Sequence, residues 1–334
     1  MELKSRNGTI DVLKFLVMVF CIMGGHFCVA YPIESPWPFY SNGIFVEFYL
    51  IITGFYTYHH FYKIQNGGGQ GYLLYVFKKF SRFLPYIIIS NFILYLSIGD
   101  YSLSNLWNMV VEDFLLTSVF LENINRNFPL WMLTAMFVVF PVFCQLCSIK
   151  NRGIVEVISV IVPLCYYSDI STAVTATYPF QLIRVFSGML IGVLIYELCN
   201  QKIAEKINVR HRFCFGFLIS IILLTASGFG FDNRRVILIL ISISLLFLLD
   251  LNGLAAKISN RYTDYLGDLS MIIYIVHAPI GFIVRDVSLN YNSIFICLLL
   301  YYVGTIFCAV LLFCLVKRWC DIKNVIFKRI IVRD

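Results

Sequence analysis

Apolar runs about as long as a membrane-spanning helix recur along the whole chain, and they constrain the fold more than any other feature. A helix that crosses a bilayer needs about 20 apolar residues, with a range of about 17–25. Ten runs approach or meet this length, at about 10–31, 42–62, 83–99, 130–148, 154–170, 178–199, 213–229, 235–250, 269–285 and 293–316. No polar stretch between them is long enough for a separate fold. We therefore predict one all-α integral membrane domain over residues 1–334, with about ten transmembrane helices.

The composition excludes an ordinary soluble protein. Charged residues make up 13% of the chain, against about 25% in a typical soluble domain. The net charge of +7 is no sign of nucleic-acid binding, because the basic residues lie between the spans rather than in one patch. Most cysteines lie in apolar runs, and the pair Cys144 and Cys147 has no second pair that would complete a zinc site. We expect neither a bound metal nor a nucleic-acid partner.

Lysine and arginine placement sets the predicted orientation, because cytoplasmic loops carry an excess of both. With the N-terminus in the cytoplasm, 21 of the 26 Lys and Arg residues fall on the cytoplasmic side. Four fall outside (Arg126, Arg234, Arg235 and Arg285), and Arg184 falls within a span. Because a miscount by one helix would destroy this asymmetry, it supports ten spans with both termini cytoplasmic, in a multi-pass protein of a cell membrane such as the bacterial inner membrane.

Three segments outside the spans have a distinct character. Residues 72–83 (YLLYVFKKFSRF) predict a basic, aromatic amphipathic helix at the cytoplasmic interface. Residues 100–128 mix acidic and apolar side chains, which favours an outer interfacial or re-entrant segment that partly covers a site. Residues 317–334 predict a basic cytoplasmic tail.

Ionisable side chains inside membrane spans are costly and usually mark function. Lys14 and His26 lie about 18 Å apart along the first predicted helix, so that Lys14 is near the inner face and His26 is deep towards the outer one. Glu47 and Arg184 fall in the same outer layer as His26. Histidine exchanges a proton near neutral pH, a carboxylate can orient it, and arginine can stabilise an oxyanion. Alternatively, these groups pair only to satisfy one another while the helices pack.

The remaining histidines favour structural interpretations. His277 is alone near the middle of its span and fits a hydrogen-bonded core residue better than a catalytic one. His59 and His60 lie among aromatic residues at a cytoplasmic helix end, which favours interfacial anchoring. His211 lies in a basic loop and is expected to be solvated.

A basic group of residues is predicted on the cytoplasmic side, formed by Lys14, Lys78, Lys79 and Arg82. These side chains would hold a phosphate-bearing donor. Attraction to anionic lipid, at about 1 kcal/mol per residue near the surface, explains them equally well.

Six motifs in order resemble the acyltransferase 3 family of membrane-bound O-acyltransferases over nearly the whole chain. They are IDVLKFLVMVFCIMGGHF in the first span, NGIFVEFYLIITGFY in the second, KKFSRFLP, PLWMLTAMF, IRVFSGMLIGVLIY and YLGDLSMIIYIVHAPI. Thr53 replaces the serine usual before Gly54, and Lys79 replaces the first arginine of R-x-x-R. Eleven residues separate Lys14 from His26 rather than ten, which rotates His26 by about 100° on a regular helix. A helical bulge, or a bend at Gly24 and Gly25, would restore its direction.

The resemblance implies transfer of an acyl group, usually acetyl, from cytoplasmic acyl-CoA to a hydroxyl of a cell-surface or lipid-linked polysaccharide. His26 would be the general base, or else carry the acyl group itself. Glu47 would orient His26, and Arg184 or a nearby polar group would stabilise the tetrahedral intermediate. Lys14, Lys78, Lys79 and Arg82 would hold the CoA phosphates. Within the matching motifs, Ser270, Tyr274, His277 and Trp131 are supporting candidates.

Two other functions fit the same ionisable groups. In a proton-coupled transporter His26, Glu47 and Arg184 would form a relay, but the chain lacks the internal repeat and the paired broken helices usual in transporters. A glycan flippase or polymerase would rely on large outer loops or an arginine-rich lumen. The four arginines predicted outside leave few basic groups for that purpose.

Overall fold

The computed structural model describes residues 6–30, 42–64, 72–98, 102–108, 127–169, 180–200, 208–228, 231, 233–249, 254–288 and 294–331. These residues are almost all helical, and no strand occurs among them. The helices are α1 (Gly8–Leu16), η1 (Val17–Met23), α2 (Gly24–Ala30), η2 (Asn42–Phe45), α3 (Val46–Ile64), α4 (Tyr72–Ser81), α5 (Leu84–Ile98), α6 (Leu103–Asn108), η4 (Phe128–Leu130), α7 (Trp131–Cys147), α8 (Arg152–Tyr167), α10 (Phe180–Asn200), α11 (Val209–Gly228), α12 (Arg234–Leu248), α13 (Leu254–Lys257), α14 (Arg261–Ser288) and α15 (Ile294–Ile331). The predicted all-α class is confirmed for this part of the chain.

Each of the ten predicted spans contains a helix, but they differ in length and polarity. Among the described residues, five helical stretches are long and apolar enough to cross a membrane unaided: Gly8–Phe27, Phe180–Asn200, Val209–Ala226, Arg261–Arg285 and Ile294–Trp319. Leu74–Ser81 and Leu84–Ser97, which meet at 42°, add a sixth if the bent pair forms one span. The chain is thus a multi-pass membrane protein. The number ten and the cytoplasmic termini stay predictions.

The first span is one helical rod with an irregular middle. The Asn7 side chain accepts a hydrogen bond from the Ile10 N–H at 3.2 Å, which caps the start of α1. Between α1 and α2 the chain runs through η1, a π-helical segment at Val17–Met23. A π bulge adds one residue to a helix without breaking it. The π segment therefore absorbs the eleventh residue between Lys14 and His26, and of the two expected remedies the bulge is confirmed.

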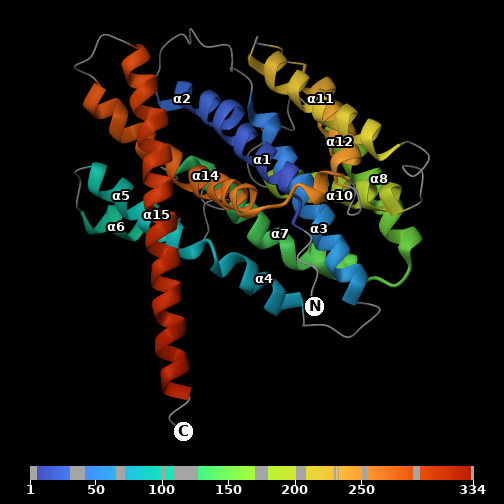
Figure 1. The fold of residues 1–334 in the computed structure, drawn as a ribbon, viewed down its shortest axis with the longest axis horizontal. Coiled ribbons are helices and arrows are strands. Elements are labelled where there is room, and N and C mark those ends of the chain that lie inside the picture. Colours follow the sequence, from blue (N-terminus) through green and yellow to red (C-terminus); the bar gives the residue numbers. More distant parts are fainter. Residues whose placement is uncertain are drawn as a thin grey trace.

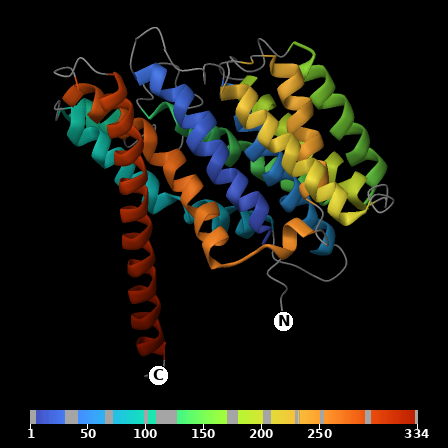
Figure 2. The same cartoon turned by 45° about the horizontal axis from the view of Figure 1, so that its top comes forward.

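The first span lies between two groups of helices. In Figure 2 it (blue) runs beside α14 (orange) on one side and beside α11 and α12 (yellow to gold) on the other. Residue contacts join α1 to α14 and η1 to α11. The first span and α14 bury 61% and 67% of their most apolar windows, whereas the α11 and α15 spans bury only 22%. Helices that bury so little apolar surface against protein are suited to face lipid.

Helices α3 and α10 make the closest contact between helices that the glycines reveal. A Cβ at Gly54 of α3 would lie 2.0 Å from the Met189 carbonyl oxygen, and one at Gly192 of α10 would lie 2.2 Å from the Ile51 carbonyl oxygen. Two helix backbones can approach this closely only where both lack side chains. This contact fixes Glu47, at the start of α3, against Arg184 of α10.

The segments outside the spans are described only in part. The predicted amphipathic helix is present as α4, and its place at the cytoplasmic interface stays a prediction. Of the segment 100–128, most residues lie outside the described part of the chain; the described α6 exposes Leu103 and Trp107. The predicted tail continues α15 as far as Ile331, and this helix projects well beyond the others (Figure 1).

Candidate active site

A cluster of charged side chains fixes the first span against α14 at one end. Arg6 Nε donates to Asp11 Oδ2 at 2.6 Å, and its Nη2 donates to Asp268 Oδ1 at 2.8 Å. Lys14 Nζ donates to the other Asp11 oxygen at 3.0 Å. A Cβ at Gly267 would lie 2.4 Å from Asp11 Oδ1, so only glycine lets this carboxylate approach α14. Sequence reasoning selected Lys14 here but missed Arg6 and its ion pairs.

The guanidinium of Arg6 stays a cation in this cluster. Burial is the largest single influence and lowers its pKa. The hydrogen bonds and charges of Asp268 and Asp11 together outweigh burial and raise the pKa above its ordinary value. The positive charge that holds the first span to α14 is therefore present at any pH that the protein meets.

Three of the four basic residues of the predicted donor site, Lys78, Lys79 and Arg82, differ in exposure. Lys79 Nζ lies 4.8 Å from the Phe140 ring centre and 5.6 Å from that of Tyr75, and 3.5 Å from Thr57 Oγ1. Such positions over aromatic faces stabilise an ammonium group inside the protein. Lys78 and Arg82, one helical turn apart, are exposed. Of these three residues, only Lys78 and Arg82 are exposed at the surface.

Glu47 and Arg184 form a buried ion pair. Arg184 Nε donates to Glu47 Oε1 at 2.7 Å, and Nη2 donates to Oε2 at 2.9 Å. Arg184 Nη2 also donates to the Gly43 carbonyl oxygen, and the guanidinium carbon lies 5.0 Å from the Trp131 ring centre. The side chains of Arg184 and Glu47 are only 4% and 0% exposed. This bidentate geometry fixes the plane of the guanidinium.

His26 and His277 lie in direct contact although 251 residues separate them. His26 Nδ1 is 2.7 Å from His277 Nε2. His277 is fully buried, whereas His26 keeps intermediate exposure. The second nitrogen of His277, Nδ1, lies 3.1 Å from the Ile273 carbonyl oxygen. The interpretation of His277 as a hydrogen-bonded core residue is thus correct, but its partner is the candidate base.

The middle of α14 is held by side chains from other helices. Pro279 has no N–H for the Ile275 carbonyl, four residues earlier. Ser90 Oγ and Asn127 Nδ2 donate to this oxygen instead, at 2.9 and 3.3 Å. Tyr274 donates its hydroxyl hydrogen to the Pro129 carbonyl oxygen. The sequence did not indicate a role for Ser90 or Asn127, because only the folded chain brings them to α14.

Comparison with known proteins adds the decisive observation. A family model described as an acyltransferase domain matches residues 7–316, nearly the whole chain. The chain belongs to the acyltransferase 3 family. A search of curated proteins found no match, and a search of solved structures found none either.

The family assignment agrees with the apolar helices, and together they make this protein a membrane acyltransferase. Within the part of the chain that the structure describes, no three His, Cys, Asp or Glu side chains gather as metal ligands. Cys144 and Cys147 are buried and do not form a disulfide.

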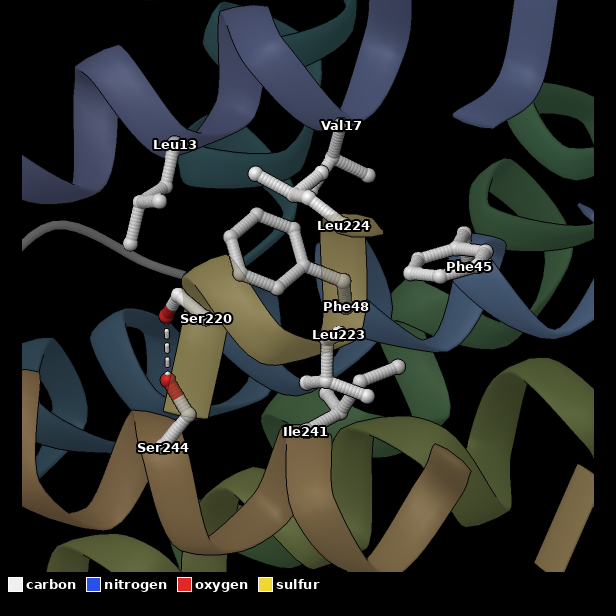
Figure 3. A pocket seen from close by; sticks show the side chains of 9 residues that line it. All are labelled: Leu13, Val17, Phe45, Phe48, Ser220, Leu223, Leu224, Ile241 and Ser244. Carbon is white, nitrogen blue, oxygen red and sulfur yellow. Dashed lines mark hydrogen bonds between the residues drawn. The ribbon is translucent and has the colours of Figure 1, made fainter. Parts of the chain in front are cut away.

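A small apolar cavity beside the first span is separate from the candidate site of this acyltransferase. Figure 3 shows Leu13 and Val17 of the first span facing Phe48 across it, with Ser220 and Ser244 at one side. The two serine hydroxyls bond each other at 2.6 Å. The cavity is small, at about 20 Å³, which is enough to hold a water molecule. None of the predicted site residues lines it.

The structure thus places the three predicted catalytic residues in two pairs, one of which the supporting candidate His277 completes. His26 contacts His277, and Glu47 binds Arg184. The expected role of Glu47 in orienting His26 stays a prediction, because the contact at His26 Nδ1 comes from His277 while both Glu47 oxygens accept from Arg184. Of the supporting candidates, Trp131 lies against Arg184, and Tyr274 lies beside His277 with ring centres 5.8 Å apart. Ser270 donates to the Gly267 carbonyl oxygen at 2.8 Å.

Proposed function

We propose that this protein is an O-acyltransferase, which moves an acyl group, in the first instance acetyl, from cytoplasmic acyl-CoA to a hydroxyl of a cell-surface or lipid-linked polysaccharide. Membership of the acyltransferase 3 family supports the reaction type. The observation that carries the proposal is the contact of His26, in the first span, with His277 of α14. A histidine that is partly exposed on one side and hydrogen-bonded on the other is suited to remove a proton from an acceptor hydroxyl.

In the proposed reaction the oxygen of the acceptor hydroxyl attacks the thioester carbonyl while His26 takes the hydroxyl proton. A C–O bond forms, and the carbonyl becomes a tetrahedral oxyanion. Collapse of this intermediate breaks the C–S bond, and the leaving CoA thiolate takes from His26 the proton that came from the acceptor hydroxyl. Arg184 would stabilise the oxyanion, since a fixed cation in a site that excludes water acts strongly on developing charge. Glu47 keeps this guanidinium in place.

The donor would bind through its phosphates at the predicted cytoplasmic face. Lys78 and Arg82 are the residues proposed to contact them, because they are exposed and one turn apart. Lys79, which lies over the rings of Tyr75 and Phe140, would add its charge to theirs. Lys14, which is bound to Asp11, would place its charge at the start of the path towards His26.

The test supplies radiolabelled acetyl-CoA to membranes that contain the wild type, His26→Ala or His211→Ala. His211 is an exposed histidine of α11 and serves as the matched control. Label should pass to glycan with the wild type and the control and be lost with His26→Ala, at equal protein levels. Unchanged labelling with His26→Ala would refute its role. Movement of an unmodified solute under a pH gradient, without labelled glycan, would favour the transporter.

A further inference from the structure

We infer that His277 is the positioning residue of the reaction: it fixes the proton of His26 on Nδ1 and takes up part of the charge that His26 gains. This inference deepens the proposed function and rests on it for the catalytic part. The assignment of the proton itself rests on the geometry of the two rings alone.

The protonation pattern follows from one carbonyl group. The Ile273 oxygen can only accept a hydrogen bond, so His277 Nδ1, at 3.1 Å, must carry a hydrogen. In a neutral imidazole the other nitrogen, Nε2, then carries the lone pair. This nitrogen lies 2.7 Å from His26 Nδ1, which must therefore be the donor of that bond. A neutral His26 protonated on Nδ1 has its lone pair on Nε2, the nitrogen that a general base uses.

The two rings are arranged for a strong N–H···N bond rather than for stacking. Their planes differ by 8° and their centres are 5.0 Å apart. The ring centres can be no farther apart than the N···N distance plus the distance from each nitrogen to the centre of its own ring. The observed separation of the centres is close to this maximum. The rings therefore lie end to end in nearly one plane. Such a line of atoms gives the nearly straight donor angle that hydrogen bonds prefer.

Both helices are fixed where they carry the rings. The α14 segment around His277 is held by Ser90 and Asn127 at the Ile275 carbonyl. The first span presents His26 in the required direction because η1 absorbs the extra residue. π bulges are frequent at functional sites, where they re-aim a side chain. The pair is thus positioned from both sides.

The arrangement gives the proton a defined route. When His26 Nε2 takes the proton of the acceptor hydroxyl, the ring becomes an imidazolium. Its Nδ1 hydrogen can then move to His277 Nε2, which leaves His26 neutral and His277 positively charged. Reversal of both movements returns the proton to the CoA thiolate. The charge is shared between two rings, and no proton is gained or lost.

The test is a long-range ¹H–¹⁵N spectrum of the full-length protein in lipid nanodiscs, with ¹⁵N-labelled histidine and no substrate. His26→Gln identifies the His26 signals by their loss. We expect His26 in the neutral form protonated on Nδ1. A wild-type His26 protonated on Nε2 would overturn the inference, whatever the activity. The expected spectrum with no acyl transfer from any acyl-CoA would instead refute the proposed function alone.

Two variants test the catalytic part. In His277→Leu the His26 proton should distribute over both nitrogens, and kcat should fall about 10²-fold with an unchanged KM for acetyl-CoA, as expected for a misaligned group. His277→Gln offers Oε1 as an acceptor to His26 Nδ1 and should restore the proton position and part of kcat. Equal losses in both variants, with an unaltered His26 spectrum and normal thermal stability, would show that His277 does not act through the tautomer.

Discussion

The Glu47–Arg184 ion pair offers a perturbation that separates structural from catalytic roles. Glu47→Met removes the carboxylate but keeps a side chain of similar length. It leaves the Arg184 guanidinium buried with the Gly43 carbonyl oxygen as the remaining acceptor among the contacts described above. In the double variant, with Arg184→Met added, neither charge of the pair remains in the buried site.

The magnitude follows from burial and geometry. Both side chains are almost fully enclosed, at 4% and 0% exposure, and two short hydrogen bonds of 2.7 and 2.9 Å join them. Breaking a buried pair by removing one partner costs about 3–5 kcal/mol, because a desolvated charge stays uncompensated. Replacing both partners by apolar residues is often neutral or even stabilising by about 1–4 kcal/mol. We therefore expect Glu47→Met to be much less stable than the wild type, and the double variant to recover.

The assay combines thermal unfolding of the purified protein with acetyl transfer in membranes. The double variant should regain the unfolding midpoint but not activity, because the cation proposed to stabilise the oxyanion is gone. If Glu47→Met alone has the same unfolding midpoint as the wild type, the pair is not a buried ion pair whose loss leaves a charge uncompensated. If the double variant regains activity together with stability, Arg184 acts only in packing and its proposed role is wrong.

Two further predictions concern helix packing and the π segment. Gly54→Ala places a methyl 2.0 Å from the Met189 carbonyl oxygen and should cost about 1–3 kcal/mol or more, seen as a lower thermal midpoint. In the control Gly153→Ala the nearest atom is at 3.5 Å, so that the midpoint should not fall; equal behaviour of the two would contradict the close α3–α10 contact. Deleting the outward-facing Phe20 should convert η1 to a regular α-helix and keep acetyl transfer, whereas inserting one alanine after Phe20 should abolish it. Loss of transfer in both would contradict the role given to the π segment.

The helix positions were predictable from sequence because the length and polarity of an apolar run are local properties. Every predicted span contains a helix, even where that helix, such as α8 or α12, is short. The departure in the Lys14–His26 spacing also pointed correctly to a bulge in the first span. Lys79 shows the limit: its basic character was evident, but its position over the Phe140 ring depends on how α4 packs against α7.

The sequence by itself determined the class of protein, the family and the four ionisable groups Lys14, His26, Glu47 and Arg184 inside apolar runs. Only the tertiary structure decided their partners. His26 and His277 are 251 residues apart, and Glu47 and Arg184 are 137 apart. Hydropathy carries no information on which helix packs against which. That choice depends on close contacts between helices, such as that of Gly54 of α3 with Met189 of α10 and that of Gly267 with Asp11.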